Sequence, residues 1–175
     1  MLYCSELETL FKKEGEKCES LALLHNMAAS YYNALSVCVN LPLISLSAVG
    51  GFLSTTQLFE DQMLALGGLS IFLSILKSME TYFGWTKRSE QHRYIALAYQ
   101  KLHRIIATNL SLDRGDRMRA KELIDLVQNE LDTLTSSEPI IPNIVIRKFK
   151  KQYGEYDTAK PSIANGLTSI RIYSV

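Results

Sequence analysis

Side chains that could bind a metal ion or activate a nucleophile are few and scattered in this sequence. The three histidines, His25, His92 and His103, form no HExxH motif or comparable cluster. His92 and His103 are roughly three helical turns apart, but such a pair arises by chance on a bundle surface far more often than as a metal site. No serine lies in a G-x-S-x-G elbow, and no cysteine has a plausible base. We therefore expect no catalytic residue, no metal site, no cofactor and no enzymatic activity.

Net charge and cysteine usage narrow the class of protein further. A formal net charge of +1 gives no support for a nucleic-acid-binding surface, so we expect no nucleic acid partner. Cys4, Cys18 and Cys38 are odd in number and have no CxxC or Cys/His spacing. This argues against a disulfide framework or a zinc site and favours a reducing compartment.

Charged residues are absent from one long part of the chain. No Asp, Glu, Lys or Arg occurs in residues 20–59 or 62–76, and only Glu60 and Asp61 separate these two stretches. The average composition resembles that of a soluble protein, but the segregation of charge does not. It indicates a lipid-facing insert between two water-facing parts.

Two membrane crossings fit into this insert. Residues 33–55 span about 34 Å as a helix, against a hydrocarbon core of about 30 Å, and residues 62–85 are of similar length. We predict a transmembrane hairpin over 33–85, with an acidic turn at 56–61. In the first crossing, Pro42 removes a backbone donor and is expected to kink the helix, and Asn40 is a polar residue that favours a protein neighbour over lipid.

Residues at the ends of the crossings set the expected orientation. Aromatic residues and a lysine that can snorkel are expected to anchor the hairpin at one interface. Lysines and arginines lie near this interface on both sides of the hairpin, whereas the turn is acidic, so the positive-inside rule places both termini in the cytoplasm. The expected anchors are Tyr31, Tyr32, Lys77, Tyr82 and Trp85.

The rest of the chain has the pattern of water-soluble helices. Residues 1–32 predict a cytoplasmic N-terminal helix that runs into the first crossing. Residues 86–153 predict a cytoplasmic helical bundle, because apolar residues recur at three-to-four spacing among charged ones. Residues 154–175 lack that pattern and predict an extended, irregular C-terminal tail. The expected fold class is therefore all-α: a two-pass transmembrane hairpin whose long helices extend into a cytoplasmic bundle.

A short helix at the end of that bundle, residues 143–153, carries a cluster of positive charges. The charges either contact anionic lipid headgroups, where each contributes about 1 kcal/mol near the surface, or form a solvated helix face. The residues concerned are Arg147, Lys148, Lys150 and Lys151.

Small residues recur every four positions in both predicted crossings, a spacing that lets membrane helices approach closely. These positions are Ser47, Gly51 and Thr55 in the first crossing and Ser70, Ser74 and Ser78 in the second. The glycine pairs at 50–51 and 67–68 lack the Lys-Ser/Thr of a phosphate loop and fit the same close-packing role. The stripes either pack the two helices of one hairpin on each other or build a homo-oligomer in which Asn40 and serines line a polar path.

Short sequence patterns occur in a fixed order from about residue 20 to 153. They are Ala28-Ala29-Ser30-Tyr31-Tyr32, Asn40-Leu41-Pro42, Leu46-Ser47-Ala48, Gly50-Gly51, His92-Arg93-Tyr94, Tyr99-Gln100-Lys101-Leu102, the helix 117–134, and Pro139-Ile140-Ile141-Pro142 before Phe149. This order of patterns resembles the SLATT families, which are two-transmembrane proteins of bacterial nucleotide-dependent conflict systems with relatives in large DNA viruses. The resemblance implies a non-enzymatic membrane effector that forms pores when a cytoplasmic sensor triggers it. This chain contains no fused sensor or nucleotide-making domain.

Three hypotheses follow for the function. The first is a self-associating, non-enzymatic membrane protein that forms pores or perturbs the membrane, with the lipid bilayer, copies of itself and a sensor protein as partners. The alternative is a structural membrane protein of a large DNA virus particle, in the virion or host-cell membrane, that links the membrane to a capsid protein shell. The third is a soluble helical protein whose uncharged stretches are buried in its core.

Overall fold

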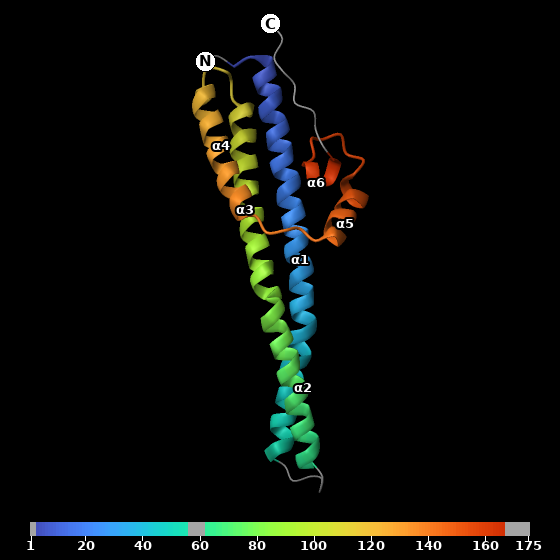
Figure 1. Ribbon diagram of the computed structural model, residues 1–175. Helices are drawn as coiled ribbons and strands as arrows, with labels where there is room; N and C mark the ends of the chain where they lie inside the picture. The colour runs from blue at the N-terminus through green and yellow to red at the C-terminus, as the bar shows by residue number, and fades with distance from the viewer. Residues whose placement is uncertain (1–2, 56–61, 167–175) are drawn as a thin grey trace. The chain divides into compact units, whose positions relative to one another are not determined.

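The computed structural model describes residues 3–55 and 62–166, and within these ranges the chain is helical, without strands (Figure 1). The predicted all-α fold is confirmed, with two long apolar helices that fit a hairpin. The predicted acidic turn, with Glu60 and Asp61, and residues 167–175 of the tail lie outside the described residues. The helices are α1 (Ser5–Thr55), α2 (Gln62–Phe83), α3 (Trp85–Ser111), α4 (Ala120–Ser137), α5 (Asn143–Tyr153) and α6 (Ser162–Asn165).

The chain divides into two compact units, and each is described by itself. Residues 1–28 and 91–175 form one unit, which we call the bundle unit. Residues 29–90 form the other, the hairpin unit. The divisions fall inside α1 and inside α3, so both helices contribute to both units.

The core of the bundle unit is built from apolar stripes on α1, α3 and α4. On each helix the buried residues are three, four or seven positions apart. These spacings keep the side chains on one face of a helix. Burying each large apolar side chain contributes roughly 1.5–3 kcal/mol. The core residues are Phe11, Cys18, Ala22, Ile95, Tyr99, Leu102, Ile106, Leu123, Val127 and Leu134.

Gly15 allows α1 and α3 to approach closely. A Cβ atom at this position would lie 3.2 Å from Cγ2 of Ile106 on α3. The backbone carbonyl of Gly15 also bonds to Nδ1 of His103 at 2.9 Å. The glycine that weakens the helical pattern of the sequence therefore lies at a point of tertiary contact.

Glu8 ties the start of α1 to the loop between α3 and α4. Its carboxylate accepts hydrogen bonds from Arg114 Nε at 2.9 Å and from Arg117 Nη1 at 2.6 Å. Those bonds hold the pKa of Glu8 at about 2. Because this pKa is depressed, the ion pair is intact above the carboxyl group's ordinary pKa of about 4.5 and is lost only as the pH falls toward 2.

Helix α5 is amphipathic and buries one face in the bundle unit. It begins after Pro142, whose fixed φ suits a helix start. Val145 and Phe149, one turn apart, are 3% and 1% exposed. The tail beyond α5 was predicted to be extended, but it contains the one-turn helix α6, which begins after Pro161.

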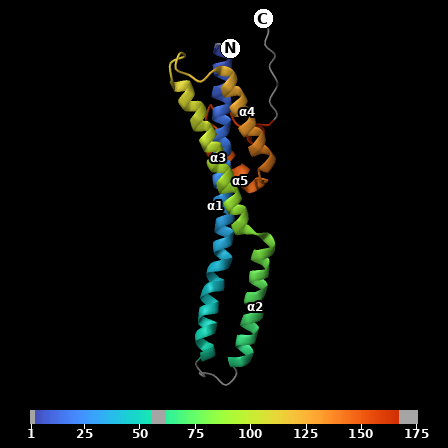
Figure 2. The same cartoon turned by 90° about the vertical axis from the view of Figure 1, so that its left-hand side faces the viewer.

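In the hairpin unit α1 and α2 run side by side (Figure 2). Half-buried leucines recur on one face of each helix, at Leu43, Leu46 and Leu53 of α1 and at Leu66, Leu69, Leu73 and Leu76 of α2. Steps of three and four are those of a helix seam. Gly50 permits the close approach, because a Cβ there would lie 3.1 Å from Cδ2 of Leu69.

A glycine separates α2 from α3. Gly84 has a φ of +59°, in the left-handed region that other residues rarely adopt. Its amide donates to Glu80 and its carbonyl accepts from Arg88, both at 2.9 Å. The second predicted crossing, 62–85, therefore corresponds to α2, which ends at Phe83, and to the first residue of α3.

Candidate functional site

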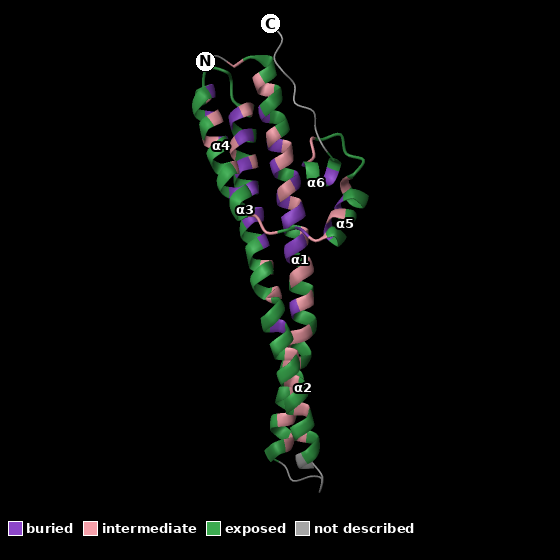
Figure 3. Ribbon diagram, in the orientation of Figure 1, coloured by how far each residue is buried: buried purple, intermediate pink, exposed green. Residues whose placement is uncertain are grey.

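The hairpin unit exposes a long apolar surface. Figure 3 shows mostly exposed and half-buried positions on α2. Large apolar side chains on both helices are between 41% and 85% exposed. They are Val37, Leu41, Ile44, Val49, Phe52, Leu64, Ile71, Phe72, Ile75, Met79, Tyr82 and Phe83. Soluble proteins rarely expose contiguous apolar patches of more than a few hundred square ångströms, so a surface of this extent indicates a site covered by something apolar.

The apolar helices are not the core of this chain. Two helical stretches, Ser5–Thr55 and Leu64–Ser111, are long and apolar enough to cross a membrane. Only 6% of the most apolar 18-residue window of the first stretch is buried, and none of the corresponding window of the second. A core helix of a soluble protein passes the same test of length and composition, but its window is mostly buried. This distinguishes the observed arrangement from the third hypothesis, in which uncharged stretches fill a protein core.

A polar cluster joins α1, α2 and α3 within the hairpin unit. Lys77 Nζ donates to Glu80 Oε2 at 3.0 Å, and Thr86 Oγ1 donates to Glu80 Oε1 at 3.0 Å. Ser36 Oγ lies 2.8 Å from Thr86 Oγ1 and accepts a hydrogen bond from Asn40 Nδ2 at 2.9 Å. Lys77, which the sequence predicts as an interface anchor, is thus paired with Glu80 of its own helix. Asn40, predicted to line a polar path, is engaged by Ser36 of its own helix.

The aromatic residues of the predicted interface cluster on either side of Gly84 and near the start of the hairpin unit. The rings of Tyr31 and Tyr32 meet edge to face, with centroids 5.5 Å apart. Phe83 and Trp85 stack with an interplanar angle of 6°. The guanidinium of Arg88 lies 5.9 Å from the centroid of the Tyr32 ring, within the range of a cation–π contact. Tyr82 is 85% exposed, as an interfacial anchor would be.

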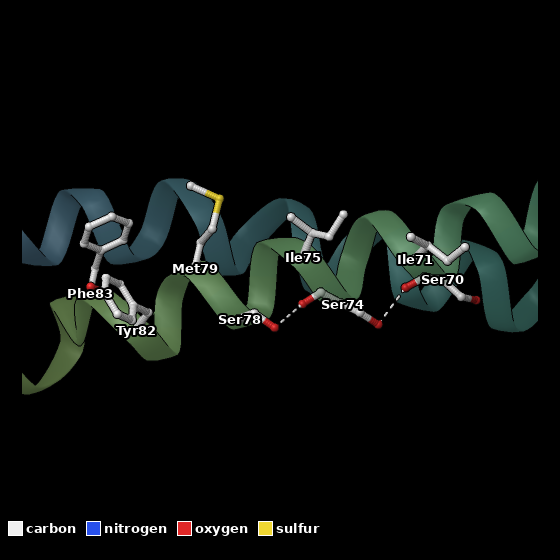
Figure 4. Close-up of a pocket in the computed structure, with 8 residues that line it drawn as sticks. All are labelled: Ser70, Ile71, Ser74, Ile75, Ser78, Met79, Tyr82 and Phe83. Carbon is white, nitrogen blue, oxygen red and sulfur yellow. Dashed lines mark hydrogen bonds between the residues drawn. The ribbon is translucent and has the colours of Figure 1, made fainter.

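The small-residue stripes lie on exposed surfaces of their helices. Ser70, Ser74 and Ser78 border a shallow apolar groove on α2 together with Ile71, Ile75, Met79, Tyr82 and Phe83 (Figure 4). Each serine hydroxyl donates to the carbonyl four residues earlier. On α1, Ser47, Gly51 and Thr55 are exposed, and Pro42 lies within the continuous helix. A Cβ at Gly51, Gly67 or Gly68 would meet no atom within 4 Å, so the close approach within the hairpin occurs at Gly50.

A second polar network is buried in the bundle unit. Nδ1 of His25 on α1 lies 2.8 Å from Nδ1 of His92 on α3. Nε2 of His25 lies 3.0 Å from Oε1 of Glu138, and Tyr99 donates its hydroxyl to Oε2 of Glu138 at 2.9 Å. His25, His92 and Tyr99 are each at most 1% exposed. The network therefore joins α1 and α3 to Glu138, the residue that directly follows α4.

Two groups of this network have shifted pKa values. Burial raises the pKa of the Glu138 carboxyl, but the hydrogen bonds from His25 and Tyr99 outweigh burial, and the net shift is downward. Burial raises the pKa of the Tyr99 phenol, and the adjacent Glu138 carboxylate raises it further. Glu138 is thus an ionised acceptor and Tyr99 a neutral donor.

Helical spacing relates His92 to His103, but in the structure His92 contacts His25. Nδ1 of His103 instead forms a hydrogen bond with the backbone carbonyl of Gly15. A signal was available, because Cys18, Ala22 and His25 continue one buried stripe of α1, and His92, Ile95 and Tyr99 continue one of α3. Two histidines at core positions require polar partners. No group of three or more His, Cys, Asp or Glu suited to a metal ion occurs in residues 3–55 and 62–166.

The basic residues of α5 form an exposed surface beside two apolar side chains. Arg147, Lys148, Lys150 and Lys151 are all exposed. Ile140, just before the helix, is 91% exposed, and Ile144 in its first turn is 49% exposed. A surface of this composition suits anionic lipid headgroups.

Comparisons of the chain with protein-family models, with curated proteins and with solved structures found no match.

Proposed function

We propose that this chain is an integral membrane protein in which the hairpin of α1 and α2 crosses the bilayer twice. The observation that carries the proposal is that protein covers so little of the apolar 18-residue segments of the hairpin. Only 6% of the first segment and 0% of the second are buried. In water this surface would be unfavourable, whereas in a hydrocarbon core each Leu, Ile, Phe or Val contributes about −0.3 to −0.6 kcal/mol to insertion. Two crossings return the chain to its starting side, and the basic residues that flank them favour the cytoplasm as that side.

The polar groups of the hairpin are satisfied in a way that suits lipid. Apart from the carbonyl that Pro42 leaves without its usual donor, the helical backbone supplies its own hydrogen bonds, as a spanning segment requires. Ser45, Ser54, Ser70, Ser74 and Ser78 each donate to a carbonyl of their own helix. Each hydroxyl therefore enters the bilayer with its donor already bonded, which lowers the penalty of removing it from water.

The three native cysteines test this proposal. Cys4 and Cys38 are exposed on the protein surface and Cys18 is buried in the bundle unit. In sealed inside-out vesicles, whose cytoplasmic face is outward, a membrane-impermeant maleimide should label a variant that retains only Cys4. A variant that retains only Cys38 should react at least about tenfold more slowly, because lipid covers this thiol and keeps the water-soluble reagent away from it. Both should react fully once detergent denatures the protein.

Equal labelling of Cys4 and Cys38 in these inside-out vesicles would contradict the proposal, because the hairpin surface would then be accessible to water. The variant that retains only Cys18 is a control for burial by protein. Burial raises the pKa of the Cys18 thiol to about 12, so Cys18 should stay unlabelled in vesicles and in mild detergent alike. Cys38 should become reactive when lipid alone is removed.

We further propose that the protein self-associates through the α2 face that carries Ser70, Ser74 and Ser78. This face lies in the groove of Figure 4 and is exposed, while the leucine seam of the hairpin is half-buried. Small residues let a second helix approach closely in lipid. The specific observation in its favour is that Ser74 and Ser78 are exposed in this groove, although Ser70 also borders the groove between α1 and α2 beside Gly50.

Cross-linking tests self-association. In a background without native cysteines, Ser74→Cys should form disulfide-linked dimers in membranes under mild oxidation. Leu73→Cys, the neighbouring position on the leucine seam, should give few dimers because its side chain is half-buried within the hairpin. Equal yields at both positions would reject this face as the interface.

For the biological role we propose a non-enzymatic membrane protein of the SLATT type, in which oligomers perturb the bilayer. The resemblance of the sequence and the exposed serine face support this role, whereas Asn40 adds no support for a polar path because it bonds to Ser36. The alternative role is attachment of a viral membrane to a capsid shell. Leakage of a dye from liposomes that depends on protein concentration is expected for the first role and not for the second.

A further inference from the structure

Helix α5 carries positive charge that no acidic side chain offsets. Its four basic residues fall within five consecutive positions, and no Asp or Glu occurs between Glu138 and Glu155. Elsewhere in the bundle unit a cation such as Arg117 is paired with a carboxylate, that of Glu8, at 2.6 Å. In the part of the chain that the structure describes, none of the four basic residues of α5 has a carboxylate within ion-pair distance. They are Arg147, Lys148, Lys150 and Lys151.

Three of these charges share one side of α5 with an exposed apolar side chain. Positions i, i+3, i+4 and i+7 lie on the same side of a helix, and here they are occupied by Ile144, Arg147, Lys148 and Lys151. All four residues are exposed, and Ile144 is 49% exposed. Phe149, on the side that packs into the bundle unit, is 1% exposed. The bundle therefore holds α5 by its apolar side and leaves these four residues, which we call the basic face, uncovered.

The composition of the basic face favours anionic lipid over nucleic acid. Lysine and arginine side chains beside an aliphatic one suit a charged membrane surface, where the cations meet phosphates and the apolar group enters the boundary with the acyl chains. Surfaces that bind single-stranded nucleic acid add aromatic side chains on which the bases stack. The exposed positions of α5 carry no aromatic side chain, and the net charge of the whole chain is only +1.

A short length of chain links the start of α5 to the first crossing of the proposed hairpin. Glu138 directly precedes the connection to α5, and its Oε1 lies 3.0 Å from Nε2 of His25 on α1. The first crossing begins at Asn33, eight residues after His25. Eight residues span at most about 29 Å. A bilayer tethered at such a distance has a high effective concentration, so a few charges suffice for docking.

We propose that the basic face of α5 docks on anionic phospholipids of the bilayer that the hairpin crosses. The inference rests on the proposed membrane hairpin, which supplies the bilayer. Arg147, Lys148 and Lys151 contact the phosphate and carboxylate groups of the lipid, and Ile144 enters the boundary between headgroups and acyl chains. Because Phe149 fixes α5 to the bundle unit, docking of this helix holds the bundle unit against an anionic membrane surface and releases it from a zwitterionic one.

Fluorescence quenching by nitroxide-labelled lipid tests the docking on the full chain in nanodiscs. A bimane fluorophore is attached to Ile144→Cys in a background without the native cysteines, and part of the lipid carries a nitroxide just below its headgroup. With phosphatidylserine present, quenching should be at least about fivefold stronger than in pure phosphatidylcholine, the effect expected of one charge near an anionic surface. Sodium chloride at about 1 M shortens the Debye length to about 3 Å and should abolish the difference.

Two variants of equal net charge test which cations are responsible. The first combines Arg147→Gln, Lys148→Gln and Lys151→Gln and should lose the phosphatidylserine-dependent quenching, since each charge strengthens association about fivefold. The second replaces one arginine and two lysines of the bundle unit outside α5 by glutamine and should keep it. Equal loss in both variants would overturn the assignment to the basic face. The exposed residues replaced in the second variant are Lys13, Lys101 and Arg104.

The variant that retains only Cys38 distinguishes a failure of α5 docking from a failure of the membrane hairpin. Cys38 lies within the first proposed crossing and is exposed on the protein surface. A bimane on Cys38 should therefore be quenched by the same lipids with or without phosphatidylserine. Quenching at Cys38 without phosphatidylserine-dependent quenching at Ile144→Cys would overturn the docking of α5 and leave the hairpin standing. Absence of quenching at both positions would overturn both proposals.

Discussion

Replacing Phe149 by alanine should lower the free energy of unfolding of the bundle unit by about 3–5 kcal/mol, the range observed when a buried aromatic ring is removed from a core. Phe149 is 1% exposed, and its ring lies 5.2 Å from that of Tyr153 between centroids. It is the largest side chain by which α5 contacts the bundle, because the other buried residue of this helix is Val145. Urea unfolding of the full chain in nanodiscs, followed by hydrogen exchange in residues 91–153, measures the change.

Ile140→Ala is the matched control for this measurement. Ile140 is an apolar residue close to α5 in sequence, but it is 91% exposed, so its truncation should change the free energy of unfolding by no more than about 0.5 kcal/mol. If Phe149→Ala and Ile140→Ala have equal effects, α5 is not docked through Phe149, and the exposed basic residues of the helix would need another explanation.

The helices and the hairpin could be predicted from the sequence because both follow from local patterns. The absence of charge from 20–59 and 62–76 determines where lipid can replace water, and three-to-four spacing determines which face of a helix is buried. The helix break at Gly84 was not predicted, because a glycine between aromatic residues near a membrane interface is also compatible with a continuous helix. Its φ of +59° is a property of the folded backbone.

The buried network depends on pairings that helical spacing cannot indicate. His25 and His92 are separated by 67 positions, and His25 and Glu138 by 113. Local spacing suggested His92 with His103, since it reports only neighbours on one helix. The faces of α1 and α3 that pack together decide the true pairing. The same reasoning explains Asn40, whose partner Ser36 is one turn away but whose cluster with Glu80 depends on the packing of α1 against α2.

The pattern of small residues was open to two interpretations for a related reason. Spacing shows that Ser70, Ser74 and Ser78 share a face of α2, but not what covers that face. The half-buried leucines show that the hairpin packs through the neighbouring face, where Gly50 lies close to Leu69. The proposed function offers lipid or a second copy of the chain as the cover of the exposed serines, and cross-linking at Ser74 discriminates between the two.

Placing a carboxylate on the apolar surface of α2 should have the largest effect of any single substitution on the hairpin. Ile71 is 66% exposed and lies near the middle of α2. In a bilayer, replacing an isoleucine by aspartate at the centre of a helix disfavours insertion by about 3 kcal/mol or more, which is more than a hundredfold in the ratio of inserted to uninserted chains. Ile71→Asp should therefore shift the protein from the carbonate-resistant membrane pellet to the supernatant or to aggregates.

The same substitution at Leu97 distinguishes lipid from water as the solvent of the hairpin. Leu97 is an apolar residue of the bundle unit with a comparable exposure of 56%. If only the bundle unit faces water, Leu97→Asp should leave membrane association unchanged and alter stability by no more than about 0.5 kcal/mol. In a soluble protein both substitutions would replace an exposed apolar side chain by a charged one, and both would raise solubility. Equal behaviour of the two variants would therefore refute the membrane hairpin. A new carboxylate is well solvated on a surface that faces water, but it is costly on a surface that faces lipid.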